Sequence, residues 1–166
     1  FTAPVSYVLE DRNGELLNAT IAADGQWRFP ESETVPQKFE DCITAFEDRR
    51  FFYHPGVDPF ALLRAVLHNS RREGGTQGGS TISMQVIRLA LQHRNRSIWI
   101  KFKESFLAIR LECRYSKKKI LALYASHAPF GGNVVGLEAA SWRYYGIPAS
   151  RLSWGQMATL AVLPNA

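Results

Sequence analysis

The stretch Ala45–Asp58 reads AFEDRRFFYHPGVD and crowds acids, arginines, aromatics and one histidine into a short segment. A helix needs an apolar stripe, but it does not need two acids followed directly by two arginines. Pro55 disfavours a helical residue before it, and the glycine after it permits a turn. We therefore predict a helix over Lys38–Phe52 that ends near His54, with Glu47 in its last turns. Taken alone, the charges could form a solvated face, so the rest of the chain must decide.

The composition is that of a globular protein. The chain has 166 residues, 46% of them hydrophobic and 21% charged, which is enough for one domain with a real core. Two cysteines are too few for a disulfide framework or a zinc site. No stretch approaches 18 consecutive apolar residues, so we predict no membrane-spanning helix. Because the sequence has no initiating methionine, we expect it to be a piece of a longer protein.

The net charge of +5 favours an anionic partner, which could be nucleic acid, an acidic membrane surface or a phosphorylated lipid. The basic residues are scattered over several predicted helices, and no DNA- or RNA-binding motif is present. We therefore expect no nucleic acid partner. The other two classes stay open.

Hydrophobic spacing and turn signals predict a mainly α fold with a small N-terminal β-meander. Turns at Asn13-Gly14 and Asp24-Gly25 separate short apolar runs, so residues 1–36 are predicted to form the meander and a linker. Residues 37–166 are predicted to form a helical domain. After the first helix, the predicted helices are Pro59–Asn69, one opened by Ser80-Thr81, Ile98–Tyr115, Lys117–Ser126, Val135–Tyr145 and, capped by Ser153, Met157–Leu163.

Two segments leave alternatives open. Ser70–Gly79 is glycine-rich and nearly imitates a phosphate-binding loop, but it lacks the lysine and the preceding strand, so we reject a nucleotide site. Backbone N–H groups at the start of the helix that follows would still favour an anion. In Ile98–Tyr115, an apolar stripe is formed by Phe102, Phe106, Ile109 and Cys113. The apolar surface of Ile98, Trp99, Phe102 and Leu89–Leu91, which is flanked by Arg94, Arg96 and Lys103, could be ordinary core or could dip into a bilayer.

Five motifs in this order resemble the peptidoglycan glycosyltransferases, which have a lysozyme-like helical fold and occur alone or as the N-terminal half of class A penicillin-binding proteins. The motifs cover most of residues 37–166. They stand here as Glu47–Gly56, Gly78–Gln85 with Ser83 for the usual threonine, Lys101–Glu104, Ile120–Tyr124 with the glycines that follow, and Ala158–Pro164. The turns and the run His54–Asp58 look most like the 1C subtype. Three departures from the family pattern are Ile100, Ser126 and Gln156.

The resemblance implies that the chain polymerises lipid II, the lipid-linked disaccharide-pentapeptide of the bacterial cell wall. The acceptor's GlcNAc 4-hydroxyl attacks C1 of the donor's MurNAc, the undecaprenyl pyrophosphate leaves, and the anomeric centre inverts to a β-1,4 link. A sugar hydroxyl is a poor nucleophile and needs a base, and the resemblance assigns that role to Glu47. His54 competes on chemistry alone, but its place beside a Pro-Gly turn favours a structural role.

The departing pyrophosphate needs its charge neutralised. Glu104, the second predicted catalytic residue, either holds a divalent cation, Mg or Mn, at the pyrophosphate or orients Lys101 and Arg88. The residues expected to contact substrate are Asp48, Phe51, His54, Gly79, Ser80, Thr81, Gln85, Arg88, Arg94, Lys101 and Asn133.

The partners that the resemblance implies are lipid II, the growing lipid-linked glycan strand and the bacterial membrane surface. They place the domain on the periplasmic side of the inner membrane. A membrane anchor and a C-terminal transpeptidase half are expected elsewhere in the full-length protein. Two rival functions remain: a peptidoglycan-cleaving enzyme of the lytic transglycosylase kind, which also relies on one glutamate, and an inactive domain that binds lipid II or glycan.

Overall fold

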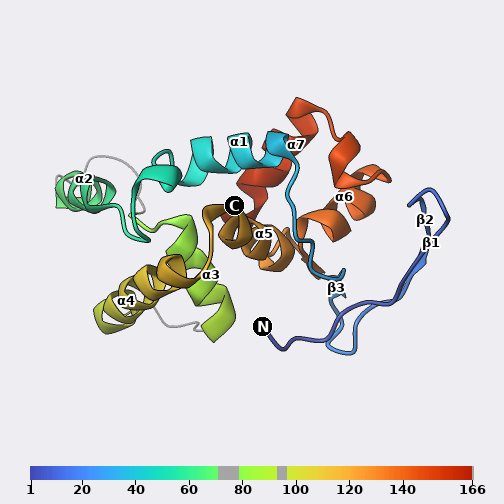
Figure 1. The fold of residues 1–166 in the computed structure, drawn as a ribbon, viewed down its shortest axis with the longest axis horizontal. Helices are drawn as coiled ribbons and strands as arrows, with labels where there is room; N and C mark the ends of the chain where they lie inside the picture. The colour runs from blue at the N-terminus through green and yellow to red at the C-terminus, as the bar shows by residue number, and fades with distance from the viewer. Residues whose placement is uncertain (71–78, 93–96, 166) are drawn as a thin grey trace.

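The computed structural model describes residues 1–70, 79–92 and 97–165 and is built mainly of helices, with a small β-region at one side (Figure 1). Its helices are α1 (Gln37–Glu47), α2 (Pro59–Ser70), α3 (Ile82–Leu91), α4 (Ile98–Arg114), α5 (Lys117–His127), α6 (Leu137–Tyr145) and α7 (Trp154–Val162). Its strands are β1 (Val8–Glu10), β2 (Leu16–Ala19), β3 (Trp27–Arg28) and β4 (Val134–Val135). The predicted mainly α fold is confirmed.

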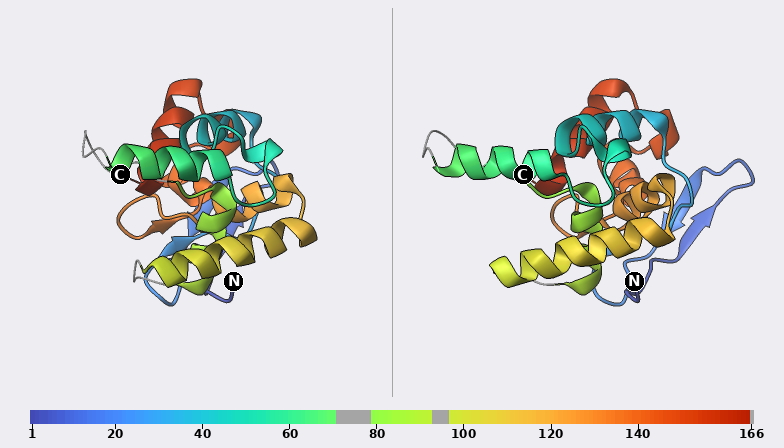
Figure 2. Two further views of the ribbon diagram at one scale, coloured as in Figure 1. Left: turned by 90° about the vertical axis from the view of Figure 1, so that its left-hand side faces the viewer. Right: turned by 60° about the vertical axis from the view of Figure 1, so that its left-hand side comes forward.

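α5 lies in the middle of the helical body, whereas α2 extends outward from it (Figures 1 and 2). In both figures, α1 and α7 lie on one side of α5 and α4 on the other, and α3 contacts both α4 and α5. The core consists of fully buried side chains from these helices and the loops between them. They include Phe39, Ile43, Phe51, Ile82, Val86, Ile120, Leu121, Phe130, Met157 and Leu160. Because α1 and α3 each bury an apolar face in this core, the residues on their other faces are held in fixed positions.

The helix starts follow their caps. The side chains of Thr81, Ser116 and Ser153 accept hydrogen bonds from backbone N–H groups in the first turns of α3, α5 and α7. The last helix therefore begins at Trp154, three residues before the predicted Met157. Its capping box is completed by Gln156, one of the departures from the family pattern, so this residue has a local structural role.

The first helix is shorter than predicted. It ends at Glu47 instead of near His54, because the backbone of Asp48 is not helical (φ −154°, ψ 74°) and its side chain bonds to residues of other segments. A 3₁₀ turn over Phe51–Tyr53 follows. Glu47 is thus the last helical residue.

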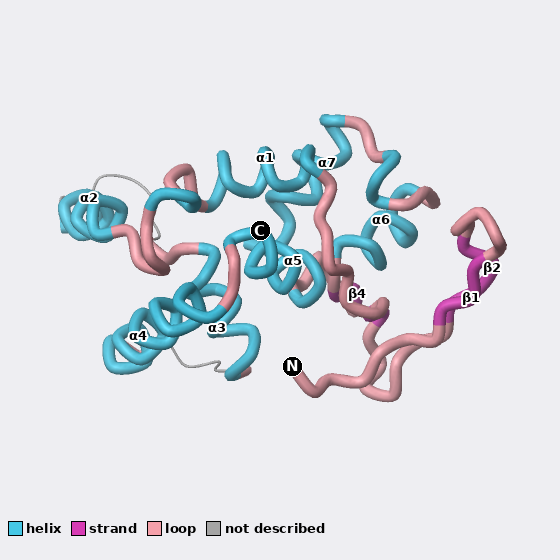
Figure 3. The backbone as a smooth tube through the Cα atoms, viewed as in Figure 1, coloured by secondary structure: helices cyan, strands magenta, loops and turns pink. Residues whose placement is uncertain are grey.

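The predicted meander is wrong in its third strand. β1 and β2 form an antiparallel hairpin that stands at the side of the molecule away from α2 and α4 (Figure 3). β3 instead pairs in parallel with β4, which lies in a region predicted as loop and helix start. The parallel pair begins where Trp27 N–H donates to the carbonyl of Asn133 (2.7 Å). The N-terminal region is therefore joined to the helical body by backbone hydrogen bonds.

Gly136 explains why α6 begins at Leu137 and not at the predicted Val135. It has φ +93°, and a Cβ there would lie 2.8 Å from the Ser126 carbonyl oxygen. Only glycine fits this approach without a shift of the backbone.

The apolar stripe of α4 is exposed. Phe102 and Phe106 are 66% and 63% exposed, Trp99 one turn earlier is 81% exposed, and Ile109 continues the same face. Core packing is therefore excluded for this stripe. Within the part of the chain that the structure describes, no helix is long and apolar enough to cross a membrane.

Candidate active site

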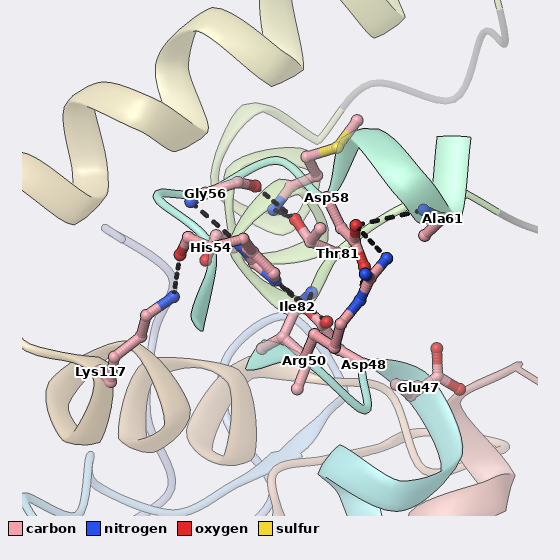
Figure 4. Close-up of polar contacts among 12 residues, drawn as sticks. Glu47, Asp48, Arg50, His54, Gly56, Asp58, Ala61, Thr81, Ile82 and Lys117 are labelled. Atoms are coloured by element: carbon pink, nitrogen blue, oxygen red, sulfur yellow. Dashed lines mark hydrogen bonds and ion pairs between the residues drawn. The ribbon is translucent and has the colours of Figure 1, made fainter. Parts of the chain in front are cut away.

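The buried carboxylate of Asp48 joins three segments (Figure 4). Its two oxygens each lie 3.0 Å from Nε2 of His54, and Oδ2 also accepts from the backbone N–H of Ile82 at 3.1 Å. Ile82 is the first residue of α3, so the carboxylate also meets the positive end of a helix dipole. The anion predicted for this helix start is therefore the protein's own Asp48.

His54 is held by hydrogen bonds at both ring nitrogens. The backbone N–H of Gly56 donates to Nδ1 at 3.2 Å, so Nδ1 carries the lone pair. The ring proton is accordingly on Nε2 and is donated to Asp48. Because the ring is buried and both nitrogens are used, this geometry favours the structural role of His54 over that of a base.

Gly56 completes this turn by a close backbone approach. It has φ +98°, and a Cβ would lie 2.7 Å from the backbone of Ala108 in α4. Its carbonyl also accepts from the hydroxyl of Thr81 at 2.6 Å. The Thr81 hydroxyl also accepts from the N–H of Met84. It therefore caps α3 and joins the start of this helix to the turn at Gly56.

Arg50 and Asp58 fix the start of α2. The Arg50 guanidinium donates to both Asp58 oxygens (3.0 and 2.6 Å), and the N–H groups of Phe60 and Ala61 donate to Asp58 Oδ1. Burial alone would raise the pKa of Asp58. The hydrogen bonds from Ala61 N–H and Arg50 outweigh burial, so this pKa lies below its usual value.

Lys117 supports the same turn from α5, and the sequence-based prediction missed it. Its ammonium donates to the carbonyl of His54 (2.6 Å) and to Glu112 (2.7 Å), and it lies 4.4 Å from the ring centre of the buried Phe51. Glu112 in turn accepts from Ser83 of α3. No signal in the sequence distinguished this residue, because Lys118 and Lys119 stand in the same first turn of α5.

Glu47 is arranged differently from its neighbours. Figure 4 shows its side chain directed away from the cluster formed by Asp48 and His54. It is partly exposed, and its Oε2 accepts from Nε2 of Gln85 in α3 at 2.8 Å. Of the acids in this stretch, Asp48 and Asp58 are buried in the scaffold, whereas Glu47 reaches partly exposed surface.

Arg88 and Glu104 form a two-point ion pair between α3 and α4. The Nε and Nη2 groups of Arg88 donate to the two Glu104 oxygens, each at 2.9 Å, and Nη2 lies 3.4 Å from the hydroxyl of Ser80. Glu104 is 3% exposed, while the guanidinium is partly exposed. The hydrogen bond with Glu104 raises the pKa of Arg88, so the guanidinium keeps its charge at any physiological pH.

This arrangement is a poor fit for the divalent cation that was one of the two roles predicted for Glu104. Both carboxylate oxygens already accept from Arg88. Among residues 1–70, 79–92 and 97–165, no group of three or more histidines, cysteines or acids could hold a metal ion. A cation such as Mg²⁺ needs several oxygen ligands, and the described residues around Glu104 do not supply them.

The other predicted contact residues are only partly brought together. Gly79 packs closely on Leu62 and Ala65 of α2, and Lys101 is exposed on α4. Asn133 lies apart from this cluster, because its side-chain amide donates to the Gly25 carbonyl in the N-terminal region at 3.0 Å. Arg94 lies outside the described residues, as do residues 71–78 of the glycine-rich loop.

Comparison with known proteins gives one consistent result. The family model described as Transglycosylase matches residues 13–166. The chain is 42% identical over 145 residues to penicillin-binding protein 1C of Escherichia coli (strain K12), covering 87% of the chain and 19% of that protein. It is 38% identical over 167 residues to penicillin-binding protein 1A of Aquifex aeolicus (strain VF5), covering 100% of the chain and 23% of that protein.

A shorter relative is also similar. The chain is 44% identical over 125 residues to the biosynthetic peptidoglycan transglycosylase of Citrobacter koseri, covering 75% of the chain and 52% of that protein. The chain thus spans about a fifth to a half of the length of these three relatives. The resemblance drawn from the five motifs is confirmed.

The depressed pKa of Asp58 predicts an acid-sensitive contribution to stability. We expect Asp58→Ala to lower the free energy of unfolding by roughly 1–3 kcal/mol at pH 7, since it removes a helix cap and the partner of Arg50. A group with a lowered native pKa stabilises above its unfolded pKa of about 3.9 and loses that contribution as pH falls through the native pKa. Urea unfolding at pH 7, 5 and 3 measures the difference from wild type.

The expected difference is constant between pH 7 and 5 and shrinks below about pH 4. Asp41→Ala, at an exposed acid of α1, is the control and should change little. A difference that persists undiminished at pH 3 would show that the Asp58 carboxylate charge is not what stabilises this turn.

Proposed function

We propose that this chain, which belongs to the transglycosylase family, polymerises lipid II by joining its disaccharides into β-1,4-linked glycan strands. Support comes from the relatives, one of which is named a biosynthetic peptidoglycan transglycosylase. The observation that carries the proposal is the position of Glu47, a partly exposed carboxylate at the end of α1 beside a helix that also presents a fixed cation.

In the proposed reaction, Glu47 takes the proton of the acceptor GlcNAc 4-hydroxyl as that oxygen attacks C1 of the donor MurNAc. The bond from C1 to the undecaprenyl pyrophosphate breaks, and a single displacement inverts the anomeric centre. Asp48 and His54 are poorly suited to the base role, since both are buried and hydrogen-bonded within the scaffold. General base catalysis of this kind contributes typically 10²- to 10⁴-fold.

Arg88 is the proposed cation for the departing pyrophosphate. The backbone N–H groups of Ile82 and Met84 at the start of α3 already donate to protein oxygens, so a nearby cationic side chain is the better candidate to meet the charge of a ligand. The Arg88 guanidinium is partly exposed, permanently charged and close to Ser80. Glu104 holds it in place and therefore acts through Arg88 rather than on the substrate.

We expect Glu47→Gln to reduce lipid II polymerisation by at least 100-fold, because the amide cannot accept the proton. The fold should be retained, since the side chain lies outside the buried cluster. The measurement is the yield of muramidase-sensitive polymer from lipid II. Glu40→Gln, at another acid of the same helix, is the control.

The same preparations separate the rival functions. Digestion of purified sacculi by the wild type, with no polymer formed, would identify a peptidoglycan-cleaving enzyme. Lipid II binding without turnover, equal in wild type and Glu47→Gln, would identify an inactive binding domain. Either result rejects the proposed polymerase.

Removing the cation should slow departure of the pyrophosphate. We expect Arg88→Ala to lower kcat on the order of 100-fold, as loss of one electrostatic donor does in other sites. Glu104→Gln should lower it about tenfold or more, because the guanidinium loses its charged partner and its fixed position. Steady-state kinetics with lipid II measures both effects. Wild-type kcat in either variant would remove Arg88 from the proposed chemistry.

We also propose that α4 rests on the surface of the membrane that carries the substrate. Its inner side holds the buried Glu104, and its outer side exposes Trp99, Phe102 and Phe106. Lys103 and Arg110 are exposed on the same helix and can meet anionic lipid headgroups. One helix thus links a bilayer surface to the ion pair in the site, which suits a periplasmic-side location at the inner membrane.

The penicillin-binding relatives are about four to five times longer than this chain. We propose that the full-length protein likewise carries a transpeptidase half and a membrane anchor in segments that these 166 residues do not cover. The growing glycan strand, still lipid-linked, would then be passed between two sites on one molecule.

Membrane contact predicts a specific loss of vesicle binding. We expect the double substitution Phe102→Ser and Phe106→Ser to weaken binding to vesicles of mixed phosphatidylglycerol and phosphatidylcholine at least tenfold, since each buried phenylalanine contributes roughly 1.5–3 kcal/mol. Co-sedimentation measures the binding. Tyr7→Ser with Leu9→Ser removes exposed apolar surface from the hairpin and is the control. Equal losses in both double variants would contradict a role confined to α4.

A further inference from the structure

Two residues of one helix face hold the two glutamates of the site. Gln85 and Arg88 are three apart in α3 and so lie on the same face. Gln85 donates to Glu47 from α1, and Arg88 donates to Glu104 from α4. The chemical difference is that Glu104 is held by a cation, whereas the amide of Gln85 is a neutral donor.

The Gln85 contact is a hydrogen bond from a neutral amide, which can orient the carboxylate without adding a positive charge of its own. The Gln85 amide holds Oε2 of Glu47 at a distance of 2.8 Å.

A second hydrogen bond joins the end of α1 to α3, next to the one between Glu47 and Gln85. Asp48, the next residue after Glu47, accepts from the N–H of Ile82, one turn before Gln85. Both helices are anchored in the core, α1 by Phe39 and Ile43 among others. The Asp48 contact holds the end of α1 against the first turn of α3, and Gln85, one turn further along α3, holds the Glu47 carboxylate.

From this geometry we propose that Gln85 is a positioning residue for Glu47, directing the carboxylate at the acceptor hydroxyl. Gln85 was expected to bind sugar or phosphate directly, and the structure supplies this different role. The inference rests on the proposed function, in which Glu47 is the base.

The test separates positioning from substrate binding. Gln85→Met keeps the side-chain length and removes the donor. Gln85→Leu also removes the donor without adding a charge, and it serves if the methionine variant does not fold. We expect either to lower kcat for lipid II polymerisation by about 10- to 100-fold with KM unchanged. Gln37→Met removes an amide that donates to acids at the other end of α1, and should match wild type.

A second measurement uses the Glu47→Gln background, in which turnover is blocked. Adding Gln85→Met to it should leave lipid II binding unchanged and cause no further loss of residual activity, because Gln85 acts only through Glu47. A raised KM and weaker lipid II binding in that background would show that Gln85 contacts substrate and would overturn the inference. Wild-type kcat in the Gln85 variants would overturn it as well.

The proposed function and the positioning role fail in different ways. If the wild type makes no polymer from lipid II, the proposed function is wrong. If the wild type polymerises and Glu47→Gln does not, while the Gln85 variants behave as wild type, only the positioning role is wrong.

Discussion

The structure depends on one buried carboxylate that serves two donors. Asp48 accepts the imidazole proton of His54 and the first backbone N–H of α3, so the end of α1, the turn after it and the start of α3 meet at one point. A buried charge without such partners would cost several kcal/mol. The carboxylate and its donors therefore stabilise one another, and Glu47, the residue before Asp48, lies next to this cluster without belonging to it (Figure 4).

α3 is the helix that holds both glutamates of the site in place. Its inner residues, such as Ile82 and Val86, are fully buried, and its other face carries Gln85 and Arg88. The two glutamates that the family resemblance marks as catalytic come from different helices, and each is fixed against this face. On this face, Glu47 accepts a hydrogen bond from the neutral amide of Gln85, and Glu104 accepts two from the guanidinium of Arg88.

Much of this was predictable from sequence because the signals are local. Caps at Ser116 and Ser153 and the Asp-Pro start of α2 marked helix beginnings, and the motif order indicated the family. The Glu47 position followed from the motif, but its partner did not, since a hydrogen bond between residues 38 positions apart leaves no periodic trace.

The errors have the same origin. The first helix was predicted to be too long, because the non-helical backbone of Asp48 goes with a hydrogen bond from Ile82, a residue far along the chain. The parallel pairing of β3 with β4 was missed because short strands give little pattern and pairing is set by tertiary contacts. The stripe of α4 has the spacing of a core helix, and spacing alone cannot distinguish a buried face from an exposed one, so the sequence left both alternatives open.

The link between β3 and β4 has a consequence for the order in which the chain matures during synthesis. Trp27 of β3 leaves the ribosome before its partner Val134 of β4, which is synthesised more than a hundred residues later. Glu31 likewise waits for His127, and Glu15 for Arg151. Contacts of such long sequence separation are entropically costly and slow to close. We therefore expect the helical core to form first and the N-terminal region, with the hairpin of β1 and β2, to pack on it last.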